Sequence, residues 1–124
     1  MNSFVKGDSV RVAMPPTLNV AYLNIPRKGR ILSPAAKAWK KNHDDLIALS
    51  LRRFDCPVVL ELTYHLGTGF RGDLSNRIKF AEDALVQAGI IPDDNHKHVR
   101  GHKTQVGEPT GRQDSEMTIK VVPA

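Results

Sequence analysis

The chain has 124 residues, about the length of one domain, and its 40% apolar and 25% charged residues are typical of a globular fold. These proportions exclude a largely disordered chain, and no apolar segment approaches the ~18 residues that span a membrane. The first residues lack the apolar segment of a signal peptide. A single cysteine, Cys56, excludes an internal disulfide and favours a reducing compartment. We therefore expect one cytoplasmic domain over residues 1–124.

Basic residues outnumber acidic ones by 18 to 13, and the net charge of +5 favours an anionic partner such as nucleic acid. The acidic side chains gather in the middle of the chain, because residues 1–41 carry one of them and residues 42–95 carry nine. This distribution fits either ordinary solvated faces or a metal site within a phosphate-binding surface.

The N-terminal part is expected to form a strand followed by a loop. Alternating apolar side chains predict a strand within residues 5–14, which Pro15-Pro16 ends because proline cannot donate to a β-ladder. Residues 15–32 contain further prolines and glycines and are expected to form a long loop, a kind of segment that is usually functional or mobile in a compact domain. The loop contains the basic residues Arg27, Lys28 and Arg30.

Ser33 and Pro34 predict the start of a helix, because a hydroxyl side chain caps a helix well and proline fits its first position. The helix is expected to run to about Leu51. Its buried face is expected to hold Ala35, Trp39, Leu46 and Leu49, with His43 interrupting the stripe.

Strict alternation predicts a strand from Val58 to Leu66. A one-faced apolar stripe then predicts a helix over residues 74–88, with Asp73 as its N-cap and Gly89 as its left-handed C-cap. Two further strands are expected near residues 98–106 and 116–122. The order β-α-β-α-β-β indicates a single small α+β domain with a mixed or antiparallel sheet and two helices.

The residues that could carry chemistry gather around the second predicted helix. Asp73, Ser75, Asn76 and Lys79 lie at its start, and Asp93-Asp94 follows its end. Hydrolysis of a phosphodiester needs a divalent cation, magnesium prefers carboxylate oxygens, and a lysine one turn along neutralises phosphate charge. The alternatives are an ordinary helix cap for Asp73 and a solvated turn for Asp93-Asp94.

His96, His98 and His102 alternate, so on a strand they would share one face. Zinc needs three or four ligands in tetrahedral geometry, and Cys56 is the only thiol. We therefore favour histidines that are solvated or contact phosphate over a zinc site.

The spacing Asp73-Leu74-Ser75-Asn76-x-x-Lys79, followed by Ala88-Gly89 and Asp93-Asp94, resembles the RusA-type Holliday junction resolvases, a family of small bacterial and phage proteins. The segment Met14-Pro15-Pro16-Thr17-Leu18-Asn19 is similar to the early Pro-Pro-Ser-x-Asn segment of that family. The resemblance thus covers most of the chain.

This resemblance implies a homodimeric endonuclease that uses magnesium or manganese to cut four-way DNA junctions in recombination and repair, within a bacterial or phage-infected cell. No membrane and no small-molecule substrate are expected. Asp73 and Asp94 would hold the metal, and Lys79 would contact the scissile phosphate. The DNA-binding residues would be Arg71, Asn76, Arg77 and Lys79, together with Arg27, Lys28 and Arg30 of the basic loop.

One position departs from the family motif Asp-x-Asp-Asn-x-x-Lys, because its second acid is Ser75 here. A hydroxyl is a neutral, weaker magnesium ligand, so the site is expected to be weakened, unless His96 completes it. An alternative is a catalytically inactive protein of the same fold that binds branched DNA. A more distant alternative is a phage protein that uses the fold without nucleic acid.

Overall fold

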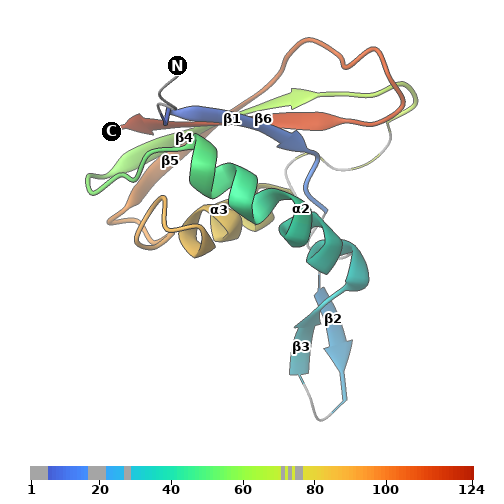
Figure 1. Ribbon diagram of the computed structural model, residues 1–124, viewed down its shortest axis with the longest axis horizontal. Coiled ribbons are helices and arrows are strands. Elements are labelled where there is room, and N and C mark those ends of the chain that lie inside the picture. Colours follow the sequence, from blue (N-terminus) through green and yellow to red (C-terminus); the bar gives the residue numbers. More distant parts are fainter. Residues whose placement is uncertain (1–5, 17–21, 27–28, 71, 73, 75–76) are drawn as a thin grey trace, which may run out of the picture.

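A four-stranded mixed sheet forms the centre of the fold, in the order β1-β6-β4-β5 (Figure 1). Its strands are β1 (Ser9–Ala13), β4 (Val58–His65), β5 (Val99–Val106) and β6 (Glu116–Pro123). Strand β6 is antiparallel to both of its neighbours, whereas β4 and β5 are parallel. The structure is a computed structural model that describes residues 6–16, 22–26, 29–70, 72, 74 and 77–124.

The helices α2 (Pro34–Ser50) and α3 (Ile78–Gln87) lie on the same side of the sheet (Figure 1). Alternate side chains of three strands are buried beneath them and form the core with the helices. Helix α3 connects the parallel strands β4 and β5, as such pairs require a crossover. The predicted α+β class, with two helices and a mixed sheet, is therefore confirmed within the described residues. The buried residues of β1, β4 and β6 that face the helices are Val10, Val12, Val58, Leu60, Leu62, Tyr64, Met117, Ile119 and Val121, and β5 adds Val99 to the core.

The long loop predicted over residues 15–32 is wrong, because this segment contains a β-hairpin. Strand β2 (Tyr22–Ile25) pairs antiparallel with β3 (Gly29–Leu32), and Figure 1 shows the hairpin extending away from the sheet. Each strand has four residues, too few to show a clear alternation in the sequence. Gly29 has a φ of 74°, a left-handed conformation that favours glycine.

The start of α2 is confirmed, because the Ser33 hydroxyl accepts a hydrogen bond from the Ala36 N–H at 3.2 Å. The prediction that Trp39 lies on the buried face is confirmed, but it is wrong for Leu46 and Leu49, which are 40% and 59% exposed. The inward face instead holds Ala36, Trp39 and Ile47.

His43 belongs to this inward face and does not interrupt it. Its Nε2 accepts a hydrogen bond from the Ala13 N–H at 3.2 Å, and its ring stacks on Trp39 with 4.6 Å between centroids. The Trp39 Nε1 donates to the Ala13 carbonyl at 2.9 Å. A polar residue therefore sits on the buried face because the end of β1 offers it a partner.

Helix α3 begins at Ile78, four residues later than predicted, and the expected N-cap at Asp73 is wrong. Arg77 occupies the cap position without a side-chain capping bond. The Tyr64 hydroxyl donates to the Leu74 carbonyl at 2.9 Å, which holds Leu74 against the sheet before the helix starts. Within the described residues, no helix combines the length and apolar character needed to cross a membrane.

Candidate functional site

The ammonium group of Lys79 lies between two carboxylates. Its Nζ forms a hydrogen-bonded ion pair with Asp94 Oδ2 and lies 3.4 Å from Asp83 Oδ1, one turn further along α3. Lys79 and Asp94 are fifteen residues apart. The fold thus brings together two of the residues that the sequence predicts for the site.

A reversal of the chain at Gly89 makes this contact possible. Gly89 has a φ of 77°, and the N–H groups of Gly89 and Ile90 donate to carbonyls of the last helical turn at 3.0 Å. This Schellman motif confirms the predicted C-cap. The buried Ile90 accepts a hydrogen bond from the Phe54 N–H at 2.8 Å. The following residues are therefore directed back along α3 toward Lys79.

Of the two adjacent acids, Asp94 is the one that reaches Lys79. The Oδ1 of Asp93 accepts a hydrogen bond from the Asp94 N–H at 2.7 Å, and its Oδ2 accepts one from Asn95 Nδ2 at 3.2 Å. Both oxygens of Asp93 are thus engaged within the turn. This difference favours Asp94 over Asp93 as the distal acid of the site.

The ion pair also shifts the titration of both partners. The hydrogen bond from Lys79 lowers the pKa of Asp94 below its ordinary value of 3.8. The same hydrogen bond raises the pKa of Lys79 above 10.5, and the nearby charge of Asp83 adds to the effect. Both groups are therefore charged throughout the neutral range.

An open hollow of about 350 Å³ lies beside the pair and has room for a hydrated cation, since a water molecule takes about 30 Å³. Its carboxylate oxygens are the ligands that magnesium prefers. Among the described residues, however, no group of three acidic, histidine or cysteine side chains could hold a metal. The predicted ligands Asp73 and Ser75 lie outside the described residues. The hollow is lined by Lys79, Asp83, Val86, Gln87, Asp93 and Asp94.

Arg77 ties the start of α3 to the N-terminal part of the chain. Its Nη1 donates to the Pro15 carbonyl at 2.8 Å, and its guanidinium carbon lies 5.3 Å from the centroid of the Phe70 ring. Arg30 lies in β3. The other predicted site residues lie outside the described residues: Arg27, Lys28, Arg71, Asp73, Ser75 and Asn76.

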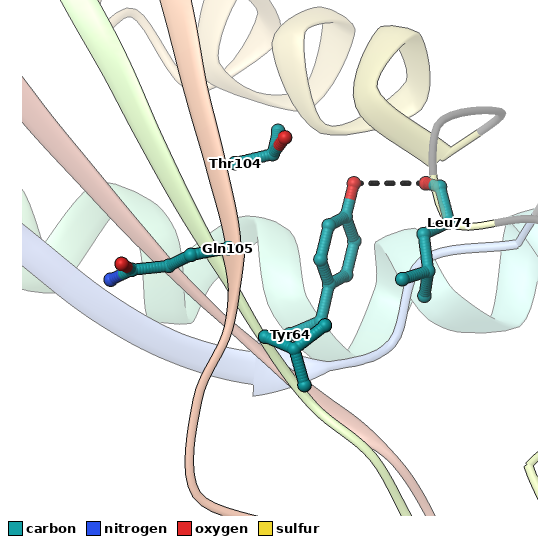
Figure 2. A pocket seen from close by; sticks show the side chains of 5 residues that line it. Tyr64, Leu74, Thr104 and Gln105 are labelled. Carbon is teal, nitrogen blue, oxygen red and sulfur yellow. Dashed lines mark hydrogen bonds between the residues drawn. The ribbon is translucent and has the colours of Figure 1, made fainter.

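Tyr64 anchors the segment that precedes α3. Figure 2 shows its side chain reaching from β4 toward Leu74, where the hydroxyl makes the hydrogen bond described above. Tyr64, Leu74, Thr104, Gln105 and Val106 line a cavity of about 210 Å³. The buried tyrosine thus fixes the position of Leu74, which lies between the predicted ligands Asp73 and Ser75 in the sequence.

The expected single face of histidines is wrong. His96 and His98 lie in a turn before β5, and only His102 lies within that strand. The His98 Nδ1 contacts Asn95 Oδ1 at 3.0 Å, whereas His102 Nε2 lies 2.6 Å from an oxygen of the buried Glu82 on α3. The three rings therefore do not form one surface for metal or phosphate.

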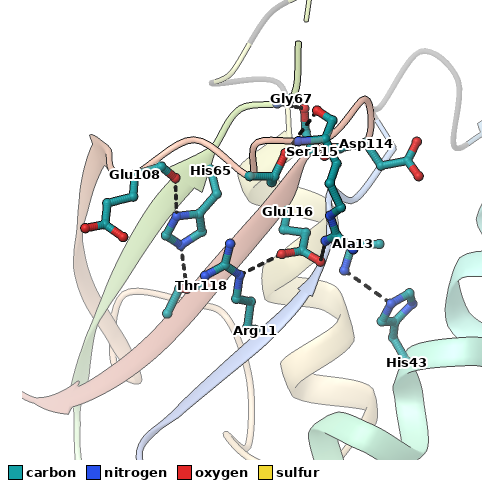
Figure 3. A network of polar contacts seen from close by, with 12 residues as sticks. Arg11, Ala13, His43, His65, Gly67, Glu108, Asp114, Ser115, Glu116 and Thr118 are labelled. Atoms are coloured by element: carbon teal, nitrogen blue, oxygen red, sulfur yellow. Dashed lines mark hydrogen bonds and ion pairs between the residues drawn. The ribbon is translucent and has the colours of Figure 1, made fainter.

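A second polar network lies on the other side of the sheet, around the ends of β1, β4 and β6 (Figure 3). Glu116 accepts hydrogen bonds from Arg11 Nε and Arg112 Nη2, both at 2.7 Å. Burial opposes the charged form of Glu116, but these two bonds outweigh it and lower its pKa. His65 contacts the Glu108 carbonyl at 2.8 Å and the Thr118 hydroxyl at 2.7 Å. These groups tie the segment between β5 and β6 to the sheet.

Sequence reasoning missed Asp83, although its spacing was a sufficient signal. Residues four apart on a helix face each other, so an aspartate at this distance from Lys79 is expected to contact it. Glu82 was also missed, and only the fold reveals that it is buried against His102.

A scan against protein-family models and a search of curated proteins both find no match to the chain.

Proposed function

We propose that the chain is a magnesium- or manganese-dependent endodeoxyribonuclease that cleaves four-way DNA junctions, as its resemblance to the RusA-type resolvases implies. It would act as a homodimer in recombination and repair of bacterial or phage DNA. The observation that supports this proposal best is the meeting of Lys79 and Asp94 beside an acidic hollow. An ordinary solvated turn at Asp93-Asp94 would not require this contact.

In this proposal, Asp73 and Asp94 hold the cation, and the Ser75 hydroxyl is a third, neutral ligand. The cation supplies an activated water and stabilises the negative charge of the transition state. Lys79 contacts the scissile phosphate and neutralises part of its charge. Lys79 lines the hollow, which suits this role.

The remaining basic and polar residues bind flanking phosphates. The hairpin β2–β3 extends from the body of the protein (Figure 1), and a two-stranded ribbon fits the major groove of DNA. The sequence places Arg27 and Lys28 between its strands and Arg30 within β3. Arg71, Asn76 and Arg77 would bind phosphates nearer the cleavage site.

The second candidate is a catalytically inactive protein that binds branched DNA through the same surface. Ser75 favours it, because replacing a carboxylate ligand by a hydroxyl lowers both the charge of a magnesium site and its affinity.

Incubating the protein with labelled four-way junction, with and without magnesium or manganese, tests both candidates. We expect metal-dependent nicking, and tighter binding to the junction than to linear duplex of equal length in a competition gel shift. The logarithm of the binding constant should fall linearly with the logarithm of the salt concentration, with a slope of about −0.9 for each phosphate contacted. Junction binding without nicking would favour the inactive protein, and equal affinity for both DNAs would contradict junction recognition.

A further inference from the structure

Helix α2 carries an exposed stripe of apolar and small residues on the side that faces away from the core. Leu46 is 40% and Leu49 is 59% exposed, and they lie about one turn apart. Single exposed apolar residues are ordinary on a protein surface, whereas this stripe continues along most of the helix. Its five exposed members share one face, because they recur at intervals of three or four residues: Ala35, Ala38, Asn42, Leu46 and Leu49.

The two halves of the stripe are complementary in size. The N-terminal half carries the small side chains Ala35 and Ala38, whereas the C-terminal half carries the large side chains Leu46 and Leu49. If Asn42 faces Asn42 of a second, antiparallel copy of α2, then Leu49 lies opposite Ala35 and Leu46 lies opposite Ala38. Large side chains thus meet small ones along the whole stripe, which is how two helices pack closely.

The charges beside the stripe fit the same arrangement. Lys37 and Lys41 lie on the N-terminal half of α2 and Asp45 on its C-terminal half, and all three are exposed. Within the part of the chain that the structure describes, none of the three forms an ion pair. Residues that flank the contact between two helices pair across it, so Asp45 of each antiparallel copy would lie near Lys41 of the other. Two parallel copies would instead bring like charges together.

We propose that this face of α2 binds a second copy of the chain, with the two α2 helices antiparallel and joined by the stripe and by two Lys41–Asp45 pairs. The contact is isologous, so it closes into a dimer and does not extend into a filament. On the two-fold axis, the amide of Asn42 can both donate to and accept from its own copy. The inference rests on the homodimer of the proposed function and assigns the surface that forms it.

The experiment is analytical ultracentrifugation of the full chain over a range of concentrations, which measures the Kd of the dimer. The variants are Leu49→Glu, Asp45→Lys, Lys41→Asp and the swap Lys41→Asp/Asp45→Lys, with thermal unfolding as a check of folding. Val106→Glu is the matched control for Leu49→Glu, because Val106 of β5 is also 59% exposed. Asp114→Lys, at an exposed position between β5 and β6, is the control for the reversal of charge.

We expect the wild type to dimerise and Leu49→Glu to raise the Kd at least about 10-fold, since burial of one leucine is worth about a factor of ten or more. Asp45→Lys and Lys41→Asp should each raise the Kd by up to about 25-fold, because each of the two symmetric pairs is worth up to about 5-fold. The swap should restore the Kd to within about 2-fold of the wild type. The two controls should leave the Kd unchanged.

A swap that weakens the dimer as much as the two single reversals combined would overturn the antiparallel pairing. A dimer that survives Leu49→Glu would place the interface elsewhere, and nicking of junctions by that dimer would leave the proposed function intact. A wild type that stays monomeric at every concentration would contradict both this inference and the proposed homodimer. Loss of thermal stability on Leu49→Glu in such a monomer would show that the chain itself covers the stripe.

Discussion

Lys79, in the first turn of α3, forms an ion pair with Asp94, which lies beyond the end of that helix in the same chain. The ten residues from Lys79 to Gly89 advance about 15 Å along a helix. Five extended residues from Gly89 to Asp94 span at most about 17 Å. The chain therefore has just enough length to return to the start of α3, and its reversal at Gly89 uses that length.

Replacing Ser75 by aspartate tests the departure from the family motif. We expect Ser75→Asp to raise magnesium-dependent nicking of a four-way junction. Loss of a residue that hydrogen-bonds to a metal ligand lowers metal affinity or activity about 10-fold or more. A new carboxylate that binds the metal directly should therefore raise the nicking rate by at least a similar factor. The measurement is the initial nicking rate at equal protein and junction concentrations.

Ser9→Asp is the matched control, because it adds the same charge at an exposed position of β1. It should leave nicking unchanged. Efficient nicking by the wild type together with impairment by Ser75→Asp would show that another ligand, such as His96, completes the site.

Local signals in the sequence were sufficient where neighbouring residues determine the structure. Ser33-Pro34 fixed the start of α2, the alternation of residues 58–66 predicted β4, and Gly89 ended α3. Each signal acts through backbone hydrogen bonds or side-chain direction within a few residues.

Other features depend on partners far away in the sequence. The start of α3 could not be predicted, because a tyrosine of β4 holds Leu74 outside the helix. The inward face of α2 includes His43, which only the end of β1 makes favourable. At the site, the spacing of Lys79 and Asp83 was visible in the sequence, whereas the contact between Lys79 and Asp94 required the fold.

The hairpin β2–β3 is expected to bind DNA without supporting the core. Replacing residues 23–31 by Gly-Gly-Ser should weaken junction binding and leave thermal stability nearly unchanged. The neighbouring pair Tyr22 and Leu32 are register partners, so a short turn can join them. If Arg27, Lys28 and Arg30 each contact a phosphate, the slope of the logarithm of the binding constant against the logarithm of the salt concentration should become shallower by up to about 2.7.

The triple variant Arg27→Ala/Lys28→Ala/Arg30→Ala should reproduce this loss in a gel-shift titration at several salt concentrations. The control is Lys37→Ala/Lys41→Ala/Lys97→Ala, which removes the same charge from exposed positions elsewhere. Equal weakening by the two triple variants would mean that net charge, rather than the hairpin, governs binding.

Glu116 should make folding stability sensitive to acid. The pKa of Glu116 in the folded protein lies below its ordinary value of 4.5. The charged side chain therefore contributes fully to folding stability above pH 4.5, and this contribution is lost as the pH falls through the pKa of the folded state. We expect Glu116→Gln to lower the free energy of unfolding by about 0.5–1 kcal/mol at pH 7. The difference from the wild type should shrink at pH 3 in urea unfolding. Glu108→Gln, at an exposed position, should show no such pH-dependent difference.

Whether Asp94 joins the Asp73 of its own chain or that of a partner subunit decides how the proposed active site is built. The contact between Asp94 and Lys79 within one chain favours the same-chain arrangement, because Lys79 follows Asp73 by six residues in the sequence. Mixing Asp73→Asn and Asp94→Asn protomers, in a Ser75→Asp background where nicking is measurable, should therefore restore no activity. In a same-chain site, every protomer of the mixture still lacks one acid.

A site shared between subunits would behave differently. Half of randomly mixed dimers would be heterodimers with one intact site each, so nicking would return at about a quarter of all sites. Energy transfer between dyes on Cys56, the single and exposed cysteine, would verify that the protomers have exchanged. Recovery of nicking in a mixture that has exchanged would exclude the same-chain arrangement, and would mean that the ion pair with Lys79 gives way to a contact across the dimer.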